Sequence, residues 1–176
     1  MHKVIAAVRT QAEFEKALSS GVEQIFDLSP DLLSLKARVD AAHEAGKKLF
    51  VHFDLATGIG KDKSGIAFAA ALGIDGVIST RVNIIRMARE AGLFTVQRFF
   101  IVDSHSVETT IEALKSSKAD TVEVMPGIAY KVICALKERL DVPIIAGGLI
   151  ETQEEANTAY ECGASAVSTG KTALWS

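Results

Sequence analysis

The chain has 176 residues, of which 48% are apolar and 23% are charged, and its formal net charge is −3. This composition excludes a disordered or collagen-like chain, because such chains lack enough apolar residues or carry a glycine repeat. Domains commonly have roughly 100–200 residues, so we assign residues 1–176 to a single domain. The weakly acidic balance argues against a protein whose main task is non-specific binding of nucleic acid, which relies on Lys and Arg.

Short apolar runs rich in β-branched residues alternate with amphipathic helical patterns along the whole chain. Eight of these runs are expected to be strands: Val4–Val8, Gln24–Leu28, Lys48–Asp54, Gly76–Thr80, Phe94–Phe100, Thr121–Met125, Pro143–Gly147 and Ala166–Thr169. Regular alternation of this kind predicts parallel strands joined by right-handed crossovers. The number of strands favours a closed (β/α)8 TIM-like barrel over an open doubly wound sheet.

The end of the chain is short for such a barrel. Only Lys171–Ser176 remain after the eighth run, too few residues for a full helix, and barrels usually have roughly 200 residues or more. We therefore expect a compact α/β barrel with a truncated final helix, reduced to a turn that ends at Trp175. The flank left by the missing helix would be a natural surface for a homodimer.

Two features bear on where the protein works. Cys134 and Cys162 are 28 residues apart in predicted helices, with no CxxC motif, and we interpret them as reduced thiols in the core of a cytoplasmic protein. No apolar stretch approaches the ~18–20 residues that span a bilayer, and no targeting segment is recognised. The sequence therefore predicts a cytoplasmic protein without membrane contact.

The strongest functional pattern lies after the last two strands. Ala146-Gly147-Gly148-Leu149 follows the seventh run, and Ser168-Thr169-Gly170-Lys171 ends the eighth. Adjacent glycines let backbone N–H groups approach an anion closely, and the hydroxyls add donors. Phosphate sites recur at this place in TIM barrels, so we expect a phosphate group to bind here. The alternative is that these glycines only form tight turns.

A second polar group lies in the third, fifth and sixth runs. His52 and Asp54 are two residues apart and are expected to share the polar face of one strand, while Glu123 lies on the polar face of another. These side chains could hold a hydroxylated ligand, bind a divalent metal or act as general acids and bases. Alternatively they form a buried network in which Arg9 and Arg98 neutralise the carboxylates. We favour a ligand-binding network over a metal site, because these residues do not form a specific metal pattern.

Basic residues near the third loop and the fourth helix are the candidates for a nucleic-acid surface. The candidates are Lys61, Lys63, Arg81 and Arg86. Neighbouring carboxylates such as Asp62 and Glu90 make a solvated helix surface the alternative interpretation. Aromatic residues are 6% of the chain, and no common RNA-binding module is recognised. These patterns alone predict a barrel that binds a phosphorylated ligand, and leave open whether it is a regulator or an enzyme.

A series of segments at the strand ends extends through the whole chain. They are Ala6-Ala7-Val8-Arg9, Val51-His52-Phe53-Asp54-Leu55, Asp75-Gly76-Val77-Ile78-Ser79-Thr80, Val96-Gln97-Arg98-Phe99-Phe100 with Asp103-Ser104, Val122-Glu123-Val124-Met125-Pro126-Gly127, Ile145-Ala146-Gly147-Gly148-Leu149-Ile150, Gly163-Ala164-Ser165-Ala166-Val167-Ser168-Thr169 and Leu174-Trp175. In order and spacing, this series resembles the bacterial glycerol-3-phosphate-responsive antiterminator family, which regulates glycerol uptake and utilisation operons. No single segment is diagnostic, but together they are specific.

The resemblance implies a small barrel that senses sn-glycerol 3-phosphate and, when loaded, binds leader mRNA so that a terminator hairpin does not stop transcription. It implies no catalytic residue, no metal and no cofactor apart from this effector. The residues expected to bind the phosphate and glycerol ends are Gly147, Gly148, Ser168, Thr169, Gly170, His52, Asp54, Arg98, Glu123 and Arg9. The alternative function is a phosphosugar or phosphotriose enzyme, since His52, Asp54 and Glu123 include acid–base candidates.

Overall fold

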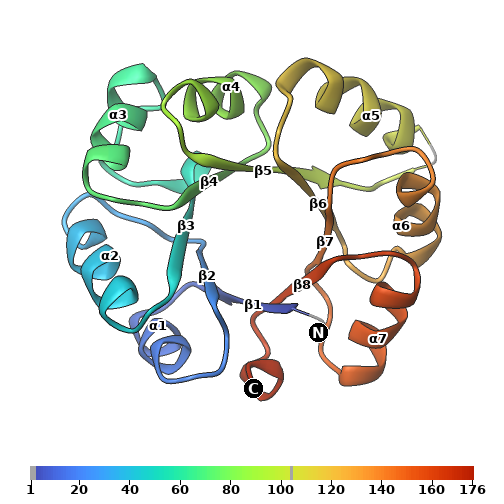
Figure 1. Cartoon of the computed structure of the whole chain (residues 1–176), viewed down its shortest axis with the longest axis horizontal. Helices are drawn as coiled ribbons and strands as arrows, with labels where there is room; N and C mark the ends of the chain where they lie inside the picture. Colours follow the sequence, from blue (N-terminus) through green and yellow to red (C-terminus); the bar gives the residue numbers. More distant parts are fainter. Residues whose placement is uncertain (1–2, 104) are drawn as a thin grey trace.

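The computed structural model describes residues 3–103 and 105–176, so Ser104 of the antiterminator-like segment lies outside the described residues. Its strands form a closed parallel barrel in chain order, with the last strand paired to the first (Figure 1). The strands of the described residues are β1 (Lys3–Val8), β2 (Gln24–Asp27), β3 (Lys48–His52), β4 (Gly76–Ser79), β5 (Phe94–Phe100), β6 (Thr121–Met125), β7 (Ile144–Gly147) and β8 (Ala166–Thr169). The predicted (β/α)8 TIM-like barrel is confirmed.

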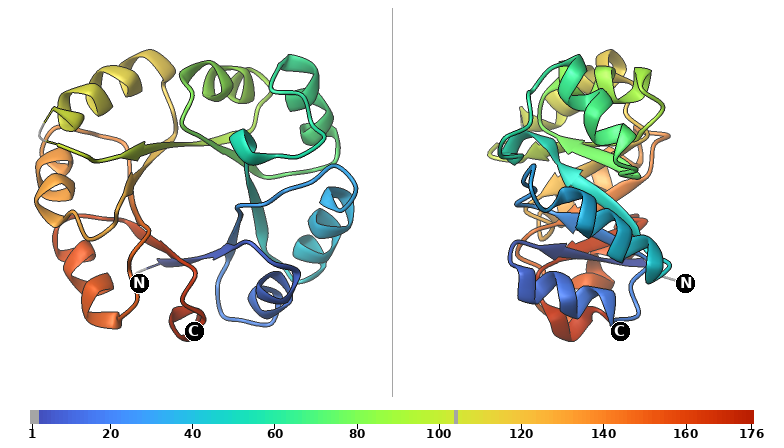
Figure 2. Two further views of the ribbon diagram at one scale, coloured as in Figure 1. Left: turned by 180° about the vertical axis from the view of Figure 1, so that it is seen from behind. Right: turned by 90° about the vertical axis from the view of Figure 1, so that its left-hand side faces the viewer.

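The helices form an outer ring around the barrel (Figures 1 and 2). Capping boxes at Thr10–Glu13 and Thr152–Glu155 satisfy free N–H groups at the starts of the first and last helices. In the described ranges, no helix is long and apolar enough to cross a membrane. The helices are α1 (Gln11–Leu18), α2 (Leu35–Glu44), α3 (Lys63–Ala71), α4 (Val82–Glu90), α5 (Ser106–Ser117), α6 (Tyr130–Lys137) and α7 (Gln153–Glu161).

The chain ends in a single 3-10 turn, η2 (Thr172–Leu174), in the gap between α7 and α1 (Figures 1 and 2). Trp175 follows this turn and is 2% exposed, packed in the core cluster that includes Phe14 of α1. Its carbonyl accepts a hydrogen bond from the N–H of Gly21 at 3.0 Å. The expected truncated last helix is therefore confirmed, with Trp175 closing this flank of the barrel. The homodimer contact expected there stays a prediction.

The barrel interior changes from apolar to polar along the strands. Inward-facing apolar side chains, among them Phe50 and Val96, form one buried cluster. Because side chains of a strand alternate between its faces, the residues two positions further on face inward as well. These residues are polar on four strands: His52, Arg98, Glu123 and Ser168. The polar layer lies at the carboxyl ends of the strands, where barrels bind ligands.

The third strand is shorter than its apolar pattern predicts. It ends at His52, and Phe53–Leu55 form a 3-10 turn, η1. The prediction that His52 and Asp54 share one face of a strand was therefore wrong. The carboxylate of Asp54 accepts hydrogen bonds from Ser79, the last residue of β4, and from Thr80, which follows it. These bonds fix the 3-10 turn at the point where the pattern predicts that β3 continues.

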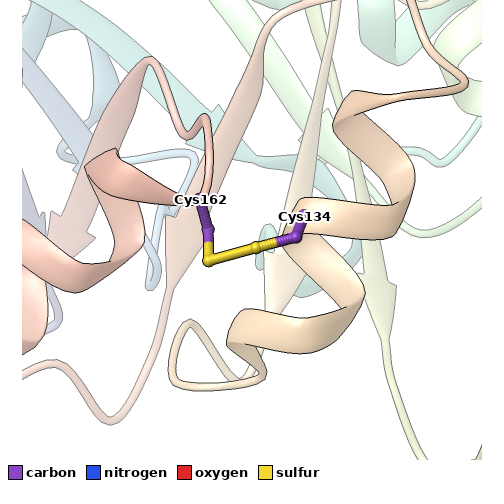
Figure 3. Close-up of a disulfide and its surroundings, with 2 residues drawn as sticks. All are labelled: Cys134 and Cys162. Carbon is purple, nitrogen blue, oxygen red and sulfur yellow. A yellow bond between two sulfur atoms is a disulfide. The ribbon is translucent and has the colours of Figure 1, made fainter.

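The two cysteines are joined in a disulfide between Cys134 in α6 and Cys162 at the end of α7 (Figure 3). Their Cα atoms are 4.6 Å apart, and both residues are partly exposed. The prediction of two reduced, buried core thiols was therefore wrong. Periodicity places each cysteine on a helix, but only the packing of α6 beside α7 shows that the two helix faces meet.

Candidate functional site

A cavity of about 570 Å³ opens at the carboxyl ends of the strands. Its polar lining includes seven of the ten residues expected to bind the effector: Arg9, Arg98, Glu123, Gly148, Ser168, Thr169 and Gly170. The remaining lining residues are Ala7, Leu28, Phe100, Met125, Pro126, Leu149, Ile150, Glu151 and Lys171. The three expected residues that do not line this cavity are Gly147, His52 and Asp54. This volume lies in the range of roughly 300–1,000 Å³ that is typical of small-molecule sites.

A buried ion pair forms part of the polar wall. The Nε of Arg98 donates to Glu123 Oε2 at 2.6 Å, and the Ser168 hydroxyl donates to Glu123 Oε1 at 2.5 Å. Arg98 is 6% exposed and Glu123 is fully buried. The expected neutralisation of Glu123 by Arg98 is confirmed. In the described part of the chain, Arg98 makes this one hydrogen bond, so both terminal amino groups of its guanidinium remain available for a ligand.

Gly147 lies directly against this hydrogen-bond network. A Cβ atom at this position would lie 2.3 Å from Glu123 Oε1 and 2.8 Å from the hydroxyl oxygen of Ser168. Both distances are far below van der Waals contact, so a side chain here would displace the buried carboxylate. The glycine thus allows the ion pair to form.

The loop after β7 has an unusual backbone. Gly148 has φ +75° and Leu149 has φ +58°, and the Leu149 side chain is 64% exposed. This left-handed conformation costs a residue other than glycine, here Leu149, roughly 1–2 kcal/mol. Such strain is concentrated at binding sites. Within residues 3–103 and 105–176, no hydrogen-bond acceptor pairs with the N–H groups of Leu149 or Gly170, whereas the N–H of Gly148 faces the carbonyl of Ser168 in the parallel register of β7 and β8. Free backbone N–H groups at a cavity wall are suited to an anion.

The hydroxyl of Thr169 is already used within the protein. It donates to the carbonyl of Ile150 at 2.6 Å and accepts from the N–H of Lys171 at 3.0 Å. Thr169 therefore joins the loop after β7 to the loop after β8. The exposed Lys171 lines the cavity beside it and adds a positive charge.

The opposite side of the barrel mouth is closed by its own hydrogen bonds. Asp54 accepts from the Ser79 hydroxyl, and its Oδ2 accepts from both the N–H and the hydroxyl of Thr80 at 2.8 Å. Burial raises the pKa of Asp54, but these hydrogen bonds outweigh the burial and the pKa is lowered. The carboxylate thus fixes the turn after β4.

His52 lies between the two sides and is 5% exposed. Its Nε2 is 3.7 Å from Asp54 Oδ2, and in the described ranges neither ring nitrogen has a hydrogen-bond partner. Burial and the positive charge of Arg98 lower the pKa of His52 to about 4, against the opposing effect of Asp54. The imidazole is therefore neutral at pH 7.

Arg9 has a different place from the one expected. Its side chain is exposed at the cavity, and its backbone N–H donates to Glu13 at 2.7 Å. The ion pair and hydrogen bonds of Asp54 within the described residues come from His52, Ser79 and Thr80, so Arg9 takes no part in the alternative network in which Arg9 and Arg98 neutralise the carboxylates. Sequence reasoning also missed the apolar wall, including Phe100 and Met125. The strand alternation signalled it, because both lie two residues beyond an inward-facing polar side chain.

The four basic candidates for an RNA surface do not form one cluster. Lys61 donates to the carbonyl groups of Ala56 and Ile59 and lies over the Phe53 ring. Lys63 pairs with Glu90 at 3.0 Å, at the far end of α4. Arg86 donates to the carbonyl and hydroxyl of Ser116. Arg81 is exposed at the carboxyl end of β4.

Potential metal ligands are not gathered in the described residues, where no group of three or more His, Cys, Asp or Glu side chains is placed to hold an ion. The fold and the cavity define a compact (β/α)8 barrel with a polar cavity at the carboxyl ends of its strands. The chain belongs to the glycerol-3-phosphate responsive antiterminator family, whose sequence model matches residues 4–175.

Individual relatives match over nearly the full length. The chain is 35% identical over 173 residues to the uncharacterized protein YgcP of Escherichia coli K12, covering 98% of this chain and 91% of that protein. The glycerol uptake operon antiterminator regulatory protein of Listeria monocytogenes is 34% identical with a TM-score of 0.92, covering 98% and 94% of the two chains. An antiterminator-related protein of Thermotoga maritima is 33% identical with a TM-score of 0.87, covering 99% and 98%.

Aldolases share only the architecture. The deoxyribose phosphate aldolase of Aeropyrum pernix is 13% identical with a TM-score of 0.74, covering 98% of this chain and 87% of the aldolase. At this level of identity the likeness shows the fold, and a barrel fold does not define a reaction.

Proposed function

We propose that this protein binds sn-glycerol 3-phosphate in the carboxyl-end cavity and, when loaded, binds leader mRNA in the cytoplasm so that transcription continues past a terminator. The observation that carries this proposal is the set of unused donors at the cavity wall. Arg98 has free terminal amino groups, and the N–H groups of Leu149 and Gly170 have no acceptor in the described part of the chain. Family membership supports the choice of effector.

The two ends of the effector match two parts of the cavity. The phosphate would bind the N–H groups of Leu149 and Gly170, with Lys171 supplying charge from the rim. The glycerol hydroxyls would bind Arg98 and Glu123, because a carboxylate with one partner on each oxygen can accept further hydrogen bonds. His52 and Asp54 would support this site from the neighbouring strand without a direct contact.

We also propose that the protein performs no reaction on its effector. Glu123 is held between a guanidinium and a hydroxyl, and charge-assisted bonds of this kind are short and strong. His52 does not line the cavity and is neutral because of burial. Glu123 does line the cavity, but it is already bonded to Arg98 and Ser168, so we propose that it holds the ligand hydroxyls without removing a proton from them.

For RNA contact we propose the basic side chains at the carboxyl face of the barrel. Arg81 is the one of the four sequence candidates that is exposed and lies at a strand end. Arg9 and Lys171 are exposed at other strand ends of the same face. Phosphate contacts of this kind make affinity fall as salt rises.

The first test is thermal unfolding of the protein with sn-glycerol 3-phosphate, glycerol or inorganic phosphate. A ligand at ~100 times its dissociation constant stabilises a protein by about 2.7 kcal/mol, so a shift specific to sn-glycerol 3-phosphate is expected. Equal shifts with inorganic phosphate would contradict the proposed recognition of the glycerol end. Turnover of the ligand in the same samples would support the enzyme instead.

The second test measures binding of the operon leader RNA with and without the effector over a series of salt concentrations. Arg81→Glu is expected to weaken RNA binding while effector affinity is unchanged. Lys48→Glu is the matched control, because Lys48 is exposed at the start of β3, at the opposite end of the barrel. RNA affinity that is independent of the effector would contradict the proposed regulation.

A further inference from the structure

The residue Thr169 occupies a junction between three segments. Its hydroxyl bonds to the carbonyl of Ile150 after β7 and to the N–H of Lys171 after β8. Its carbonyl accepts from the indole Nε1 of Trp175 at 2.9 Å. Thr169 is 3% exposed, so all three bonds lie in a site that excludes water. One residue therefore connects both effector loops to the end of the chain.

The end of the chain is in turn fixed to α1 and the loop that follows it. The N–H of Gly21 donates to the carbonyl of Trp175 at 3.0 Å, and Lys16 Nζ donates to the Thr172 hydroxyl at 2.7 Å. A Cβ atom on Gly21 would lie 3.0 Å from the carbonyl carbon of Ser176, so the two segments are in close contact. The segment from Gly170 to Trp175 is thus anchored at the cavity and at α1.

We propose that Thr169 is a positioning residue for the effector loops, and that through Trp175 it couples occupancy of the cavity to the C-terminal turn and α1. This inference rests on the proposed function for the identity of the effector. The Thr169 hydroxyl donates its hydrogen to Ile150 and accepts a hydrogen bond from Lys171. Thr169 therefore acts through the neighbouring N–H group of Gly170, which it holds at the cavity wall by fixing Lys171, and not by touching the phosphate.

The structure offers a matched control for the loss of one buried threonine hydroxyl bond. Thr121 is also 3% exposed, and its hydroxyl donates to the carbonyl of Pro143 at 2.6 Å. This bond joins β6 to the segment before β7 at the amino end of the barrel. Thr121→Val and Thr169→Val thus remove the same kind of bond at opposite ends of the molecule. Thr169→Ser retains the hydroxyl and serves as the conservative variant.

The experiment combines calorimetric titration with sn-glycerol 3-phosphate and hydrogen exchange of the ligand-free proteins. Because the two hydrogen bonds of the hydroxyl and the order of two loops are lost, Thr169→Val is expected to weaken effector binding about tenfold. Thr121→Val and Thr169→Ser are expected to stay within about twofold of the wild type. Exchange is expected to quicken at residues 148–151 and 170–175 in Thr169→Val alone. Trp175 is the one tryptophan of the chain, and its fluorescence change on effector binding is expected to disappear in this variant.

Each other outcome overturns the inference. Weakened binding with unchanged exchange would make Thr169 a direct ligand, and equal weakening in Thr121→Val would make the effect one of general stability. Unchanged binding in Thr169→Val would exclude a positioning role. Wild-type protein that does not bind sn-glycerol 3-phosphate would contradict the proposed function, while the exchange data would still decide whether Thr169 orders the two loops. If Thr169→Val does not fold, Trp175→Phe removes the indole donor and is read in the same way.

Discussion

Two sides of the barrel mouth carry nearly the same short sequence and use it differently. Ile78-Ser79-Thr80 covers the last two residues of β4 and the residue after it, and Val167-Ser168-Thr169 ends β8. Ile78 belongs to the cluster inside the barrel, whereas Val167 belongs to a cluster between the barrel and the helices. The side-chain alternation of the two strands is therefore shifted by one residue, which exchanges the faces of the two hydroxyls.

This shift decides which side can bind a ligand. On the β4 side, Ser79 and Thr80 both bond to Asp54, which uses these donors within the protein. On the β8 side, Ser168 points inward to Glu123, and the following N–H of Gly170 has no acceptor in the part of the chain that the structure describes. A polar residue at a strand end is therefore weaker support for a binding site than a donor without an internal partner.

The largest effect is expected from removing the cation of the open side. Arg98→Met leaves Glu123 buried without its partner, and breaking a buried pair in this way costs about 3–5 kcal/mol of unfolding free energy. Binding of sn-glycerol 3-phosphate is expected to be lost in the same variant. Chemical denaturation and calorimetric titration measure the two effects.

The control for Arg98→Met is Arg139→Met. Arg139 pairs with Glu108, and both side chains are about half exposed, so its loss is expected to leave the unfolding free energy nearly unchanged. If Arg98→Met were no more destabilising than this control, the ion pair would not be a structural part of the open side.

The second effect concerns pH and the residue between the two sides. The pKa of His52 is lowered from 6.5 to about 4, so between these pH values the unfolded chain binds a proton that the folded chain does not. Stability is therefore expected to fall as pH decreases from about 6.5 to about 4, by up to about 3 kcal/mol. His52→Gln should flatten this part of the pH profile in chemical denaturation. An identical slope in the variant would assign the acid sensitivity to other groups.

The smallest effect is expected on the closed side. Asp54→Asn weakens the hydrogen bonds to Ser79 and Thr80 and is expected to cost about 1–2 kcal/mol of unfolding free energy. Asp120→Asn is a matched control at the amino end of the barrel, because Asp120 accepts from the N–H and hydroxyl of Thr95 in the same way. Effector affinity by calorimetry is expected to remain within about twofold for both variants. A tenfold loss in Asp54→Asn alone would show that the β3–β4 side binds the effector.

Much of the fold follows from local sequence patterns that do not depend on how the elements pack. Eight apolar runs at regular spacing require parallel strands with crossovers, and a remainder of six residues cannot form a full helix. The Arg98–Glu123 pair could also be predicted from the sequence, because both residues occupy polar positions of neighbouring strands. The disulfide was not, since Cys134 and Cys162 meet only when α6 packs beside α7.

The sequence by itself determined the barrel, its truncated end and the edge of the sheet where a ligand binds, because periodicity and turn residues act over a few neighbours. Only the tertiary structure decided which polar groups remain available there. It showed that Asp54, Thr169 and Lys61 are bound within the protein, whereas the terminal amino groups of Arg98 and the N–H group of Gly170 have no internal acceptor in the described residues. The physical reason is that a donor's partner comes from another strand or loop, at a distance along the chain that local patterns do not encode.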